Sequence, residues 1–176
     1  MIWFTADEHY GHKNCIKYCN RPFNNLEEMN HEIICKNNTL VKEKDTVWHL
    51  GDFTLKSKTY AEEILKQLNG IHYFIRGSHD KWLKNTRPYI KELKYNNQLI
   101  VLSHYCMRVW PLSHYNSYHL FGHSHGQLET LGKSYDVGVD NNDFYPISID
   151  KIFDIMDNKP NNFNFIEKEK NDTSKI

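Results

Sequence analysis

Aspartate and histidine residues recur in this sequence directly after short apolar runs. Five motifs of this kind follow one another along the chain: Asp7-Glu8-His9, Gly51-Asp52, Gly77-Ser78-His79-Asp80, Ser103-His104 and Gly122-His123-Ser124-His125. The apolar runs before them are typical of buried strands, and the carboxyl ends of neighbouring strands in an open α/β sheet face one crevice where ligands bind. Carboxylates crowded into such a crevice repel one another unless cations lie among them. The pattern therefore predicts a metal site, with enough ligands for two ions.

The residue types in these motifs indicate which ions would bind. Asp7 and His9 are two residues apart, so in an extended loop both side chains can reach one ion. The carboxylate of Asp52 has two oxygens and can bridge two cations. Imidazole together with carboxylate suits Mn, Fe, Co, Ni or Zn better than Mg or Ca. Two such ions about 3.5–4 Å apart hydrolyse phosphate esters, because they hold the phosphoryl oxygens and lower the pKa of a bound water.

The composition is that of one globular domain without a strong electrostatic preference. The 176 residues include 22 basic and 22 acidic side chains, so net charge gives no overall attraction to nucleic acid or to an anionic membrane. We expect neither a signal peptide nor a membrane helix, which needs ~20 apolar residues in a row. The four cysteines, which lack zinc-finger spacing, are expected to be reduced thiols in a cytoplasmic protein. They are Cys15, Cys19, Cys35 and Cys106.

Apolar periodicity predicts the elements that position the motifs. The first half is typical of two parallel crossover units, strand–helix–strand–helix–strand, and the second half of a hairpin followed by a second sheet. Strands are expected at residues 1–6, 47–50, 73–75, 90–95, 98–102, 118–122, 128–131 and 135–139, and helices at 26–40, 59–68 and 148–156. Residues 158–176 are rich in Asn, Lys and Pro, so we expect an extended or disordered tail after a domain of residues 1–157.

The five motifs, in this order over residues 1–157, resemble the calcineurin-like metallophosphoesterases. The stretch from Ser103 to Gly126 resembles the small phage and bacterial members. The resemblance implies an α/β fold, a four-layer α-β-β-α sandwich of two mixed sheets flanked by helices. It also implies a dinuclear site that holds two divalent transition-metal ions, with Mn preferred and Fe, Zn, Ni or Co as alternatives. The implied ligands are Asp7, His9, Asp52 and His125 for the first ion and Asp52, Ser78, His104 and His123 for the second.

The same resemblance implies an activity. His79 would contact the scissile phosphate or protonate the leaving group, and Asp80 would orient His79. The substrate would be a phosphomonoester or phosphodiester, with a nucleotide as one candidate, attacked directly by a metal-bound hydroxide in a monomer or homodimer. One alternative is a catalytically impaired binding module, as in the retromer subunit of this fold. Another is a nuclease, which the neutral charge and the lack of a basic stripe disfavour.

Position 78 departs from the family pattern, which has Asn there. The hydroxyl of Ser78 is on a shorter side chain and is a poorer neutral ligand than an amide oxygen. A weakened second metal site is the expected consequence. Either the protein is a natural weak-site variant, or the chain was altered to trap a ligand or to inactivate the enzyme.

Several residues outside the motifs are candidates for substrate contacts. Arg21, Arg76 and Arg108 could each bind phosphate, and Arg108 is preferred because its loop leaves a strand end that carries a ligand. His12 and Asn14 are candidates to line the pocket. Three aromatic residues either stack on a base or pack on their own domain: Tyr105, Trp110 and Tyr115. Structural roles are expected for the remaining residues: His49 and His72 within strands, a solvated His31, and ordinary sheet structure at 135–140.

Overall fold

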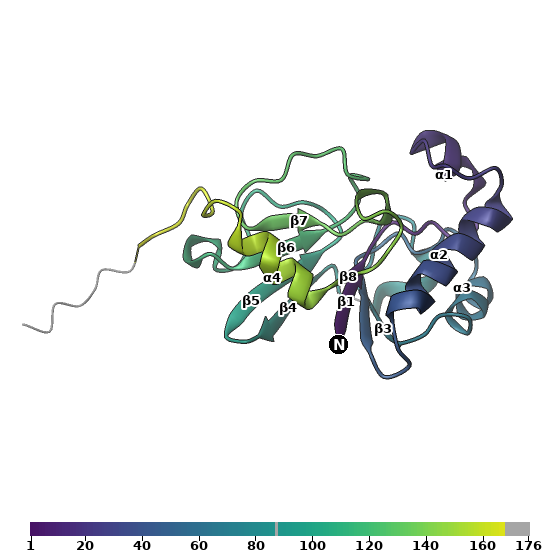
Figure 1. Cartoon of the computed structure of the whole chain (residues 1–176), viewed down its shortest axis with the longest axis horizontal. Helices are drawn as coiled ribbons and strands as arrows, with labels where there is room; N and C mark the ends of the chain where they lie inside the picture. The colour runs from purple at the N-terminus through teal and green to yellow at the C-terminus, as the bar shows by residue number, and fades with distance from the viewer. Residues whose placement is uncertain (87, 168–176) are drawn as a thin grey trace, which may run out of the picture.

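Two four-stranded sheets form the centre of the computed structural model, which describes residues 1–86 and 88–167 (Figure 1). The first sheet has the order β3-β2-β1-β8, with β1 (Ile2–Thr5), β2 (Thr46–His49), β3 (Ile71–Phe74) and β8 (Ile147–Ser148). The second has the order β4-β5-β6-β7, with β4 (Ile90–Tyr95), β5 (Gln98–Ser103), β6 (Tyr118–Phe121) and β7 (Ser134–Asp136). Strands β8 and β4 are antiparallel to their neighbours and the other pairs are parallel. Both sheets are therefore mixed, which confirms the predicted α/β class.

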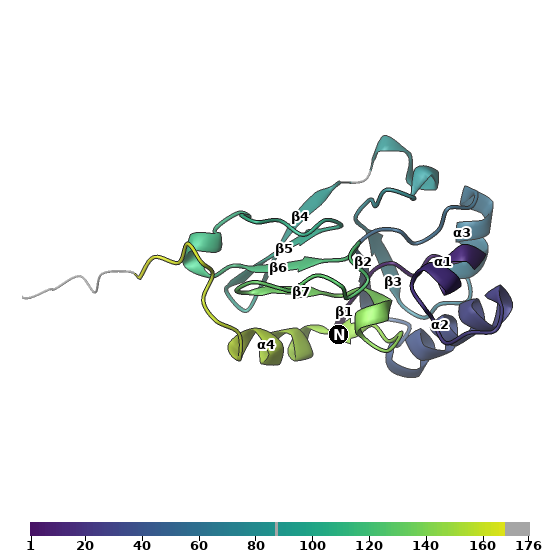
Figure 2. The same cartoon turned by 90° about the horizontal axis from the view of Figure 1, so that it is seen from above.

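Side-chain caps begin the longer helices. The helices are α1 (Lys13–Tyr18), α2 (Leu26–Leu40), α3 (Lys58–Leu65) and α4 (Ile149–Asp157), with short 3₁₀ helices η1 (Lys81–Thr86), η2 (Ser113–Tyr115) and η3 (Val139–Asn141). Asn25 accepts a hydrogen bond from the Glu28 amide at 2.8 Å, as its spacing predicts, and Ser57 and Ser148 cap α3 and α4 in the same way. Helices α1, α2 and α3 lie on the side of the first sheet away from the second sheet (Figure 2).

Apolar side chains fill the spaces on both faces of the first sheet. Between the sheets, Phe4 of β1 packs with Ile100 of β5 and Leu120 of β6, and α4 contributes Ile152 to the same core. On the other face, residues of α2 and α3 pack against β3 and the loops after β1 and β2. This packing holds β1 and β2 from both sides. The starting points of the loops at their carboxyl ends are therefore fixed.

A loop covers the outer face of the second sheet. In this loop Trp110 is 7% exposed and packs with Met107 on Leu99 and Val101 of β5, and its indole nitrogen donates to the Ser117 carbonyl oxygen at 3.1 Å. Trp110 therefore packs on its own domain, the second of the two alternatives open from the sequence. The short helix η2 belongs to the same loop, so the fourth layer here is mostly irregular chain.

One predicted strand is absent from the structure, and the predicted tail packs on the domain. Residues 128–131 form no strand, and Gly126 and Gly132 on either side of them turn the chain with left-handed φ values of 73° and 58°. The segment 158–167 has no helix or strand but is ordered. Asn162 is 3% exposed, and its amide donates to the carbonyl oxygens of Ser113 and Ser117. The tail, expected to be extended or disordered, therefore packs on the domain without regular structure over residues 158–167, and residues 168–176 lie outside the described range.

None of the helices within residues 1–86 and 88–167 combines the length and the apolar character needed to cross a membrane.

Candidate metal centre

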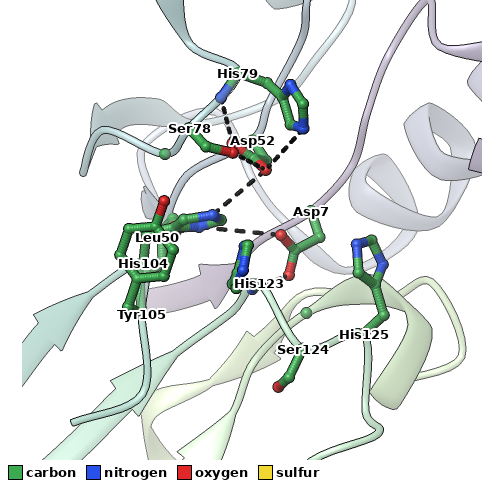
Figure 3. A network of polar contacts seen from close by, with 12 residues as sticks. Asp7, Leu50, Asp52, Ser78, His79, His104, Tyr105, His123, Ser124 and His125 are labelled. Carbon is green, nitrogen blue, oxygen red and sulfur yellow. Dashed lines mark hydrogen bonds and ion pairs between the residues drawn. The ribbon is translucent and has the colours of Figure 1, made fainter.

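The five motifs converge beyond the carboxyl ends of β1, β2, β3, β5 and β6 (Figure 3). Among the described residues, four groups of three possible ligands have donor atoms within 4.8 Å of one another, and two of these groups correspond to the two predicted ion sites. The first group is Asp7, His9 and Asp52, and the second is Asp52, His104 and His123. Asp52 belongs to both groups, which is the arrangement expected of a carboxylate that bridges two ions. The groups border a pocket of about 280 Å³.

The backbone is strained at most of these positions. Five of the predicted ligands have left-handed φ values: Asp7 (59°), His9 (54°), Asp52 (58°), His123 (69°) and His125 (49°). A non-glycine residue in this conformation costs about 1–3 kcal/mol, and such conformations gather at functional sites where surrounding packing imposes them. The left-handed backbone turns the side chains of neighbouring loop residues into one space. An extended loop without such residues would not bring them together.

Two glycines let the loops approach one another closely. A Cβ atom on Gly77 would collide with the carboxylate and the backbone amide of Asp52. A Cβ on Gly51, which has φ 99°, would lie 2.5 Å from Nδ1 of His104. The loops after β2, β3 and β5 therefore meet at van der Waals distance only because these two positions carry no side chain.

Buried donor and acceptor atoms in this space lack hydrogen bonds. They are Asp7 Oδ1, His9 Nε2 and His104 Nε2, and none has a hydrogen-bond partner among the described residues. Leaving a buried polar group unsatisfied costs about 1–3 kcal/mol. His9 Nε2 and His104 Nε2 lie 3.9 and 3.3 Å from Asp52 Oδ2, so the atoms converge. Nitrogen and carboxylate donors that converge without other partners fit divalent transition-metal ions.

The protonation states of Asp7, His9 and Asp52 also fit a cation. Burial raises the pKa of Asp7 to about 8, against the opposing effect of His104 and His125. At neutral pH this carboxyl therefore stays protonated unless a cation binds beside it. Burial lowers the pKa of His9 to about 3, which keeps its imidazole neutral and able to donate a nitrogen lone pair. Burial would raise the pKa of Asp52, but the neighbouring His104 imidazole and a hydrogen bond from the His79 amide hold it below its usual range.

His125 is held by a buried pair that the sequence did not reveal. Its Nδ1 lies 2.6 Å from Asp140 Oδ2, and Arg21 makes two hydrogen bonds of 2.7 Å to the Asp140 carboxylate. Although burial lowers the pKa of His125, the bonds with Asp140 and Cys19 raise it to about 10. A carboxylate that holds a ligand histidine fixes the ring orientation. Residues 135–140 are therefore more than ordinary sheet structure. The one sign of this in the sequence is the acidic residue Asp140, a few residues after the end of β7.

Arg21 is a structural anchor of the site. Only 5% exposed, it also donates to the carbonyl oxygens of Asp7 at 2.6 Å and Glu8 at 3.0 Å. It thereby joins the first ligand loop to Asp140. The hypothesis that Arg21 binds phosphate is wrong, because these acceptors already occupy its guanidinium group.

Asp80 has a different role from the one expected. It is fully buried, and its carboxylate accepts hydrogen bonds from the amides of Asp52 at 2.7 Å and Gly77 at 2.9 Å, and from the Trp82 indole at 3.1 Å. Asp80 therefore fixes the loop that carries Asp52. The His79 ring instead lies near other residues, with Nε2 3.8 Å from Asp52 Oδ2 and its centroid 5.4 Å from that of His9. Its side chain is 42% exposed and lines the pocket.

The proposed substrate contacts separate into two regions. The His12 ring lines the metal pocket, 5.3 Å from the ring of His9 and 6.1 Å from that of His79. Asn14 is exposed on α1 and is not among the residues that line this pocket. Arg108 lies 4.8 Å from the ring of Phe163 and lines a separate pocket on the second sheet, so its predicted phosphate contact gains no support here.

The two strand histidines form a buried chain with Glu8. His49 Nδ1 lies 2.5 Å from Glu8 Oε1, and His49 Nε2 lies 2.9 Å from His72 Nδ1. Their interpretation as structural residues agrees with this placement. The chain runs under the first ligand loop, so Glu8 points away from the metal pocket while its neighbours Asp7 and His9 point into it.

Ser78 contacts the predicted bridge. Its hydroxyl donates to the Asp52 carboxylate oxygens at 3.1 and 3.3 Å. The residue is exposed, so a longer side chain has room at this position. Ser78 therefore steadies Asp52 in this structure, a role that its shorter reach permits.

We predict that Ser78→Asn raises phosphoesterase turnover by roughly 10- to 100-fold, since an amide oxygen adds a ligand to the second ion. Turnover measured against Mn concentration should reach half-maximum at lower Mn in the variant. Ser78→Ala is the matched control, because it removes only the hydrogen bond to Asp52. Equal Mn dependence of Ser78→Asn and the parent would show that Ser78 does not limit the second site.

Comparison with known proteins places this chain among relatives without an established activity. It is 36% identical over 165 residues to the uncharacterized protein MJ1445 of Methanocaldococcus jannaschii, and the match covers 89% of this chain and 91% of that protein. The chain belongs to the family of MJ1445. No family model matches the sequence.

A solved structure shows the same fold as this member of the MJ1445 family. A protein of unknown function from Aquifex aeolicus, AQ665, is similar with a TM-score of 0.70 and 24% identity, over 88% of this chain and 98% of that one. This likeness shows the fold alone. A Vps29 single mutant from Entamoeba histolytica is similar with a TM-score of 0.43 and 17% identity, over 78% of this chain and 72% of that one.

Proposed function

We propose that this protein is a metal-dependent phosphoesterase with two divalent ions at the candidate centre. The observation that carries the proposal is the pair of ligand groups that share Asp52. The buried, unbonded atoms of Asp7, His9 and His104 aim into the same space. Two divalent ions held there would neutralise a phosphate ester and lower the pKa of a water. The ions would be Mn, with Fe, Zn, Ni or Co as alternatives, because the donor set mixes imidazole and carboxylate.

The residues of the chain supply positioning and a proton. Asp7, His9 and His125 would hold the first ion, and Asp52 would serve both ions. His104 and His123, with Ser78 as a weak neighbour, would hold the second. His79, with its ring in the pocket and its Nε2 turned toward the bridge, donates a proton to the leaving oxygen. His12 beside it contacts the ester.

An aromatic side chain at the rim favours a substrate with a planar group. Tyr105 is 46% exposed, and its ring centroid lies 4.6 Å from that of His123. A base or another aromatic group attached to the phosphate would stack on this ring while the phosphate contacts the ions. We therefore propose an aryl or nucleoside phosphate ester as the substrate class.

Metal analysis followed by hydrolysis tests the proposal. The full chain is loaded with Mn, and turnover is measured with p-nitrophenyl phosphate and bis-p-nitrophenyl phosphate. We expect Mn-dependent hydrolysis of at least one of them. Two bound ions without hydrolysis would favour a catalytically impaired binding module, for which Ser78 is the supporting feature. No bound Mn or Zn at saturating concentration would overturn the proposal.

We predict that His79→Ala lowers turnover by about 10²-fold or more, the usual contribution of a general acid. The metal content of the variant should equal that of the parent, because His79 belongs to neither ligand group. His31→Ala, on the exposed face of α2, is the matched control and should leave both quantities unchanged. If His79→Ala loses metal as Asp52 variants are expected to do, His79 is a ligand and the assigned role is wrong.

A further inference from the structure

Two thiols lie together against the candidate metal centre. Cys15, on α1, and Cys19, its C-cap residue, have sulfur atoms 3.5 Å apart. Both side chains line the metal pocket; Cys15 is 2% exposed, whereas Cys19 is partly accessible. The other two cysteines, Cys35 and Cys106, are exposed and lie outside this pocket.

The thiol pair contacts the loop that carries His125. Cys19 Sγ lies 3.3 Å from His125 Nδ1, the same nitrogen that Asp140 contacts. Donor atoms of His9, Cys15 and His125 lie within 4.8 Å of one another. A change at either sulfur would therefore act on two predicted ligands of the first ion.

A third cation is a poor explanation of this cluster. Cys19, His125 and Asp140 do have donor atoms within 4.8 Å of one another. The Asp140 carboxylate, however, already makes two hydrogen bonds of 2.7 Å with Arg21. An additional cation would have to displace that buried guanidinium or lie against its positive charge. Covalent chemistry between the two sulfurs involves no such conflict.

We propose that Cys15 and Cys19 form a peroxide-sensitive pair that oxidises reversibly to a disulfide. Hydrogen peroxide oxidises the accessible Cys19 thiol to a sulfenic acid and is itself reduced to water. The Cys15 thiol then attacks the Cys19 sulfur, the S–S bond forms, and the sulfenic oxygen leaves as a second water. A dithiol reductant reverses the reaction and returns both thiols.

The end of α1 can accommodate the bond. Cβ atoms four residues apart on a helix are about 5–6 Å from each other, and a disulfide requires about 3.5–4.5 Å. Cys19 is already outside the helix, with φ −102° and ψ 9°, and Asn20 after it has φ 50°. The helix has only six residues and no side-chain cap at its start, so its last turn is easily tightened. Closure would draw Cys19 Sγ away from His125.

The inference has one consequence that rests on the proposed metal site. Once the disulfide has moved Cys19 Sγ away, His125 Nδ1 retains its contact with Asp140 but loses its contact with Cys19. Losing an outer contact of a metal ligand typically lowers metal affinity by 10- to 100-fold. We expect roughly 10-fold weaker retention of the first ion in the oxidised protein.

Peptide mapping tests the disulfide without any measurement of phosphoesterase activity. The parent for the test is the full chain with Cys35→Ser and Cys106→Ser, which removes the exposed thiols. After treatment with hydrogen peroxide, free thiols are alkylated and the protein is digested with trypsin under non-reducing conditions. Cleavage after Lys13, Lys17 and Lys36, with none at Arg21 before Pro22, places the two cysteines in different peptides. We expect peptide 14–17 linked to peptide 18–36, with release by dithiothreitol.

Cys15→Ser in the same background is the matched control. It retains the contact of Cys19 with His125 but has no sulfur with which to close the disulfide. We expect dimedone to label Cys19 in this variant after peroxide treatment, and the parent to give the cross-link instead. The peroxide level is chosen so that it oxidises Cys35 and Cys106 in the unmodified chain. If the parent then shows no cross-linked peptides and both of its thiols are alkylated, the proposal is overturned.

Metal retention provides the second readout. Mn bound to the parent and to Cys15→Ser is measured before and after peroxide. Loss of Mn only from the cross-linked parent supports the coupling to His125. A complete disulfide with unchanged Mn content would overturn that coupling. Failure to bind any Mn before oxidation would count against the proposed function, while the peptide map would still decide the disulfide.

Discussion

Asp52→Asn is expected to lower phosphoesterase turnover by roughly 10⁴-fold, a loss of about 5–6 kcal/mol of transition-state stabilisation. The residue belongs to both ligand groups, so one substitution should weaken the binding of both ions. An amide has a single oxygen for metal and no negative charge, and it cannot bridge two cations as a carboxylate does. Elemental analysis after dialysis against Mn should show both ions depleted.

The substitution should leave the fold intact, which makes the result interpretable. Asn adopts the left-handed conformation more readily than most residues, and position 52 has φ 58°. Its side-chain oxygen can still accept the 2.8 Å bond from the His79 amide. The exposed Asp154→Asn is the control for loss of one carboxylate charge. Retention of one full equivalent of Mn by Asp52→Asn would show that Asp52 serves one ion and does not bridge.

Arg21→Met should destabilise the protein by about 3–5 kcal/mol, because it leaves the Asp140 carboxylate buried without its partner. The substitution also removes the hydrogen bonds to the Asp7 and Glu8 carbonyl oxygens that tie down the first ligand loop. The measurement is the free energy of unfolding from urea denaturation of metal-free protein. Lys17→Met, exposed on α1, is the control for loss of a cationic side chain.

A double-mutant cycle would separate the ion pair from the carbonyl contacts. In the double variant Arg21→Met with Asp140→Asn, the uncompensated charge is absent. The loss should therefore be smaller than the sum of the two single losses. Arg21→Lys keeps the charge but cannot make the paired hydrogen bonds, so an intermediate loss is expected. A loss below about 1 kcal/mol in Arg21→Met would contradict the anchoring role, because surface pairs have values of that size.

The local sequence was sufficient to predict most of the strands and the gathering of Asp and His residues at their ends. Each motif directly follows an apolar run, and parallel strands bring their carboxyl ends to one edge regardless of how the rest of the chain packs. The capping Asn at 25 is a similarly local signal, and the structure uses it as expected. Asp7, His9, Asp52, His104 and His123 accordingly come together where the strand order predicts.

Tertiary structure alone decided what supports those ligands. Arg21 and Asp140 are 119 residues apart, and Cys19 and His125 are 106 apart, so no periodic pattern relates them. Asp80 adjoins His79 in sequence, yet its oxygens accept bonds from the loop at Asp52 because that loop presents free amides to a buried carboxylate. Asn162 is held in the same way, since its side-chain amide donates to the carbonyl oxygens of Ser113 and Ser117. Residue type and spacing specify strands and strand ends, but buried polar partners are matched only when the packed chain brings unsatisfied groups together.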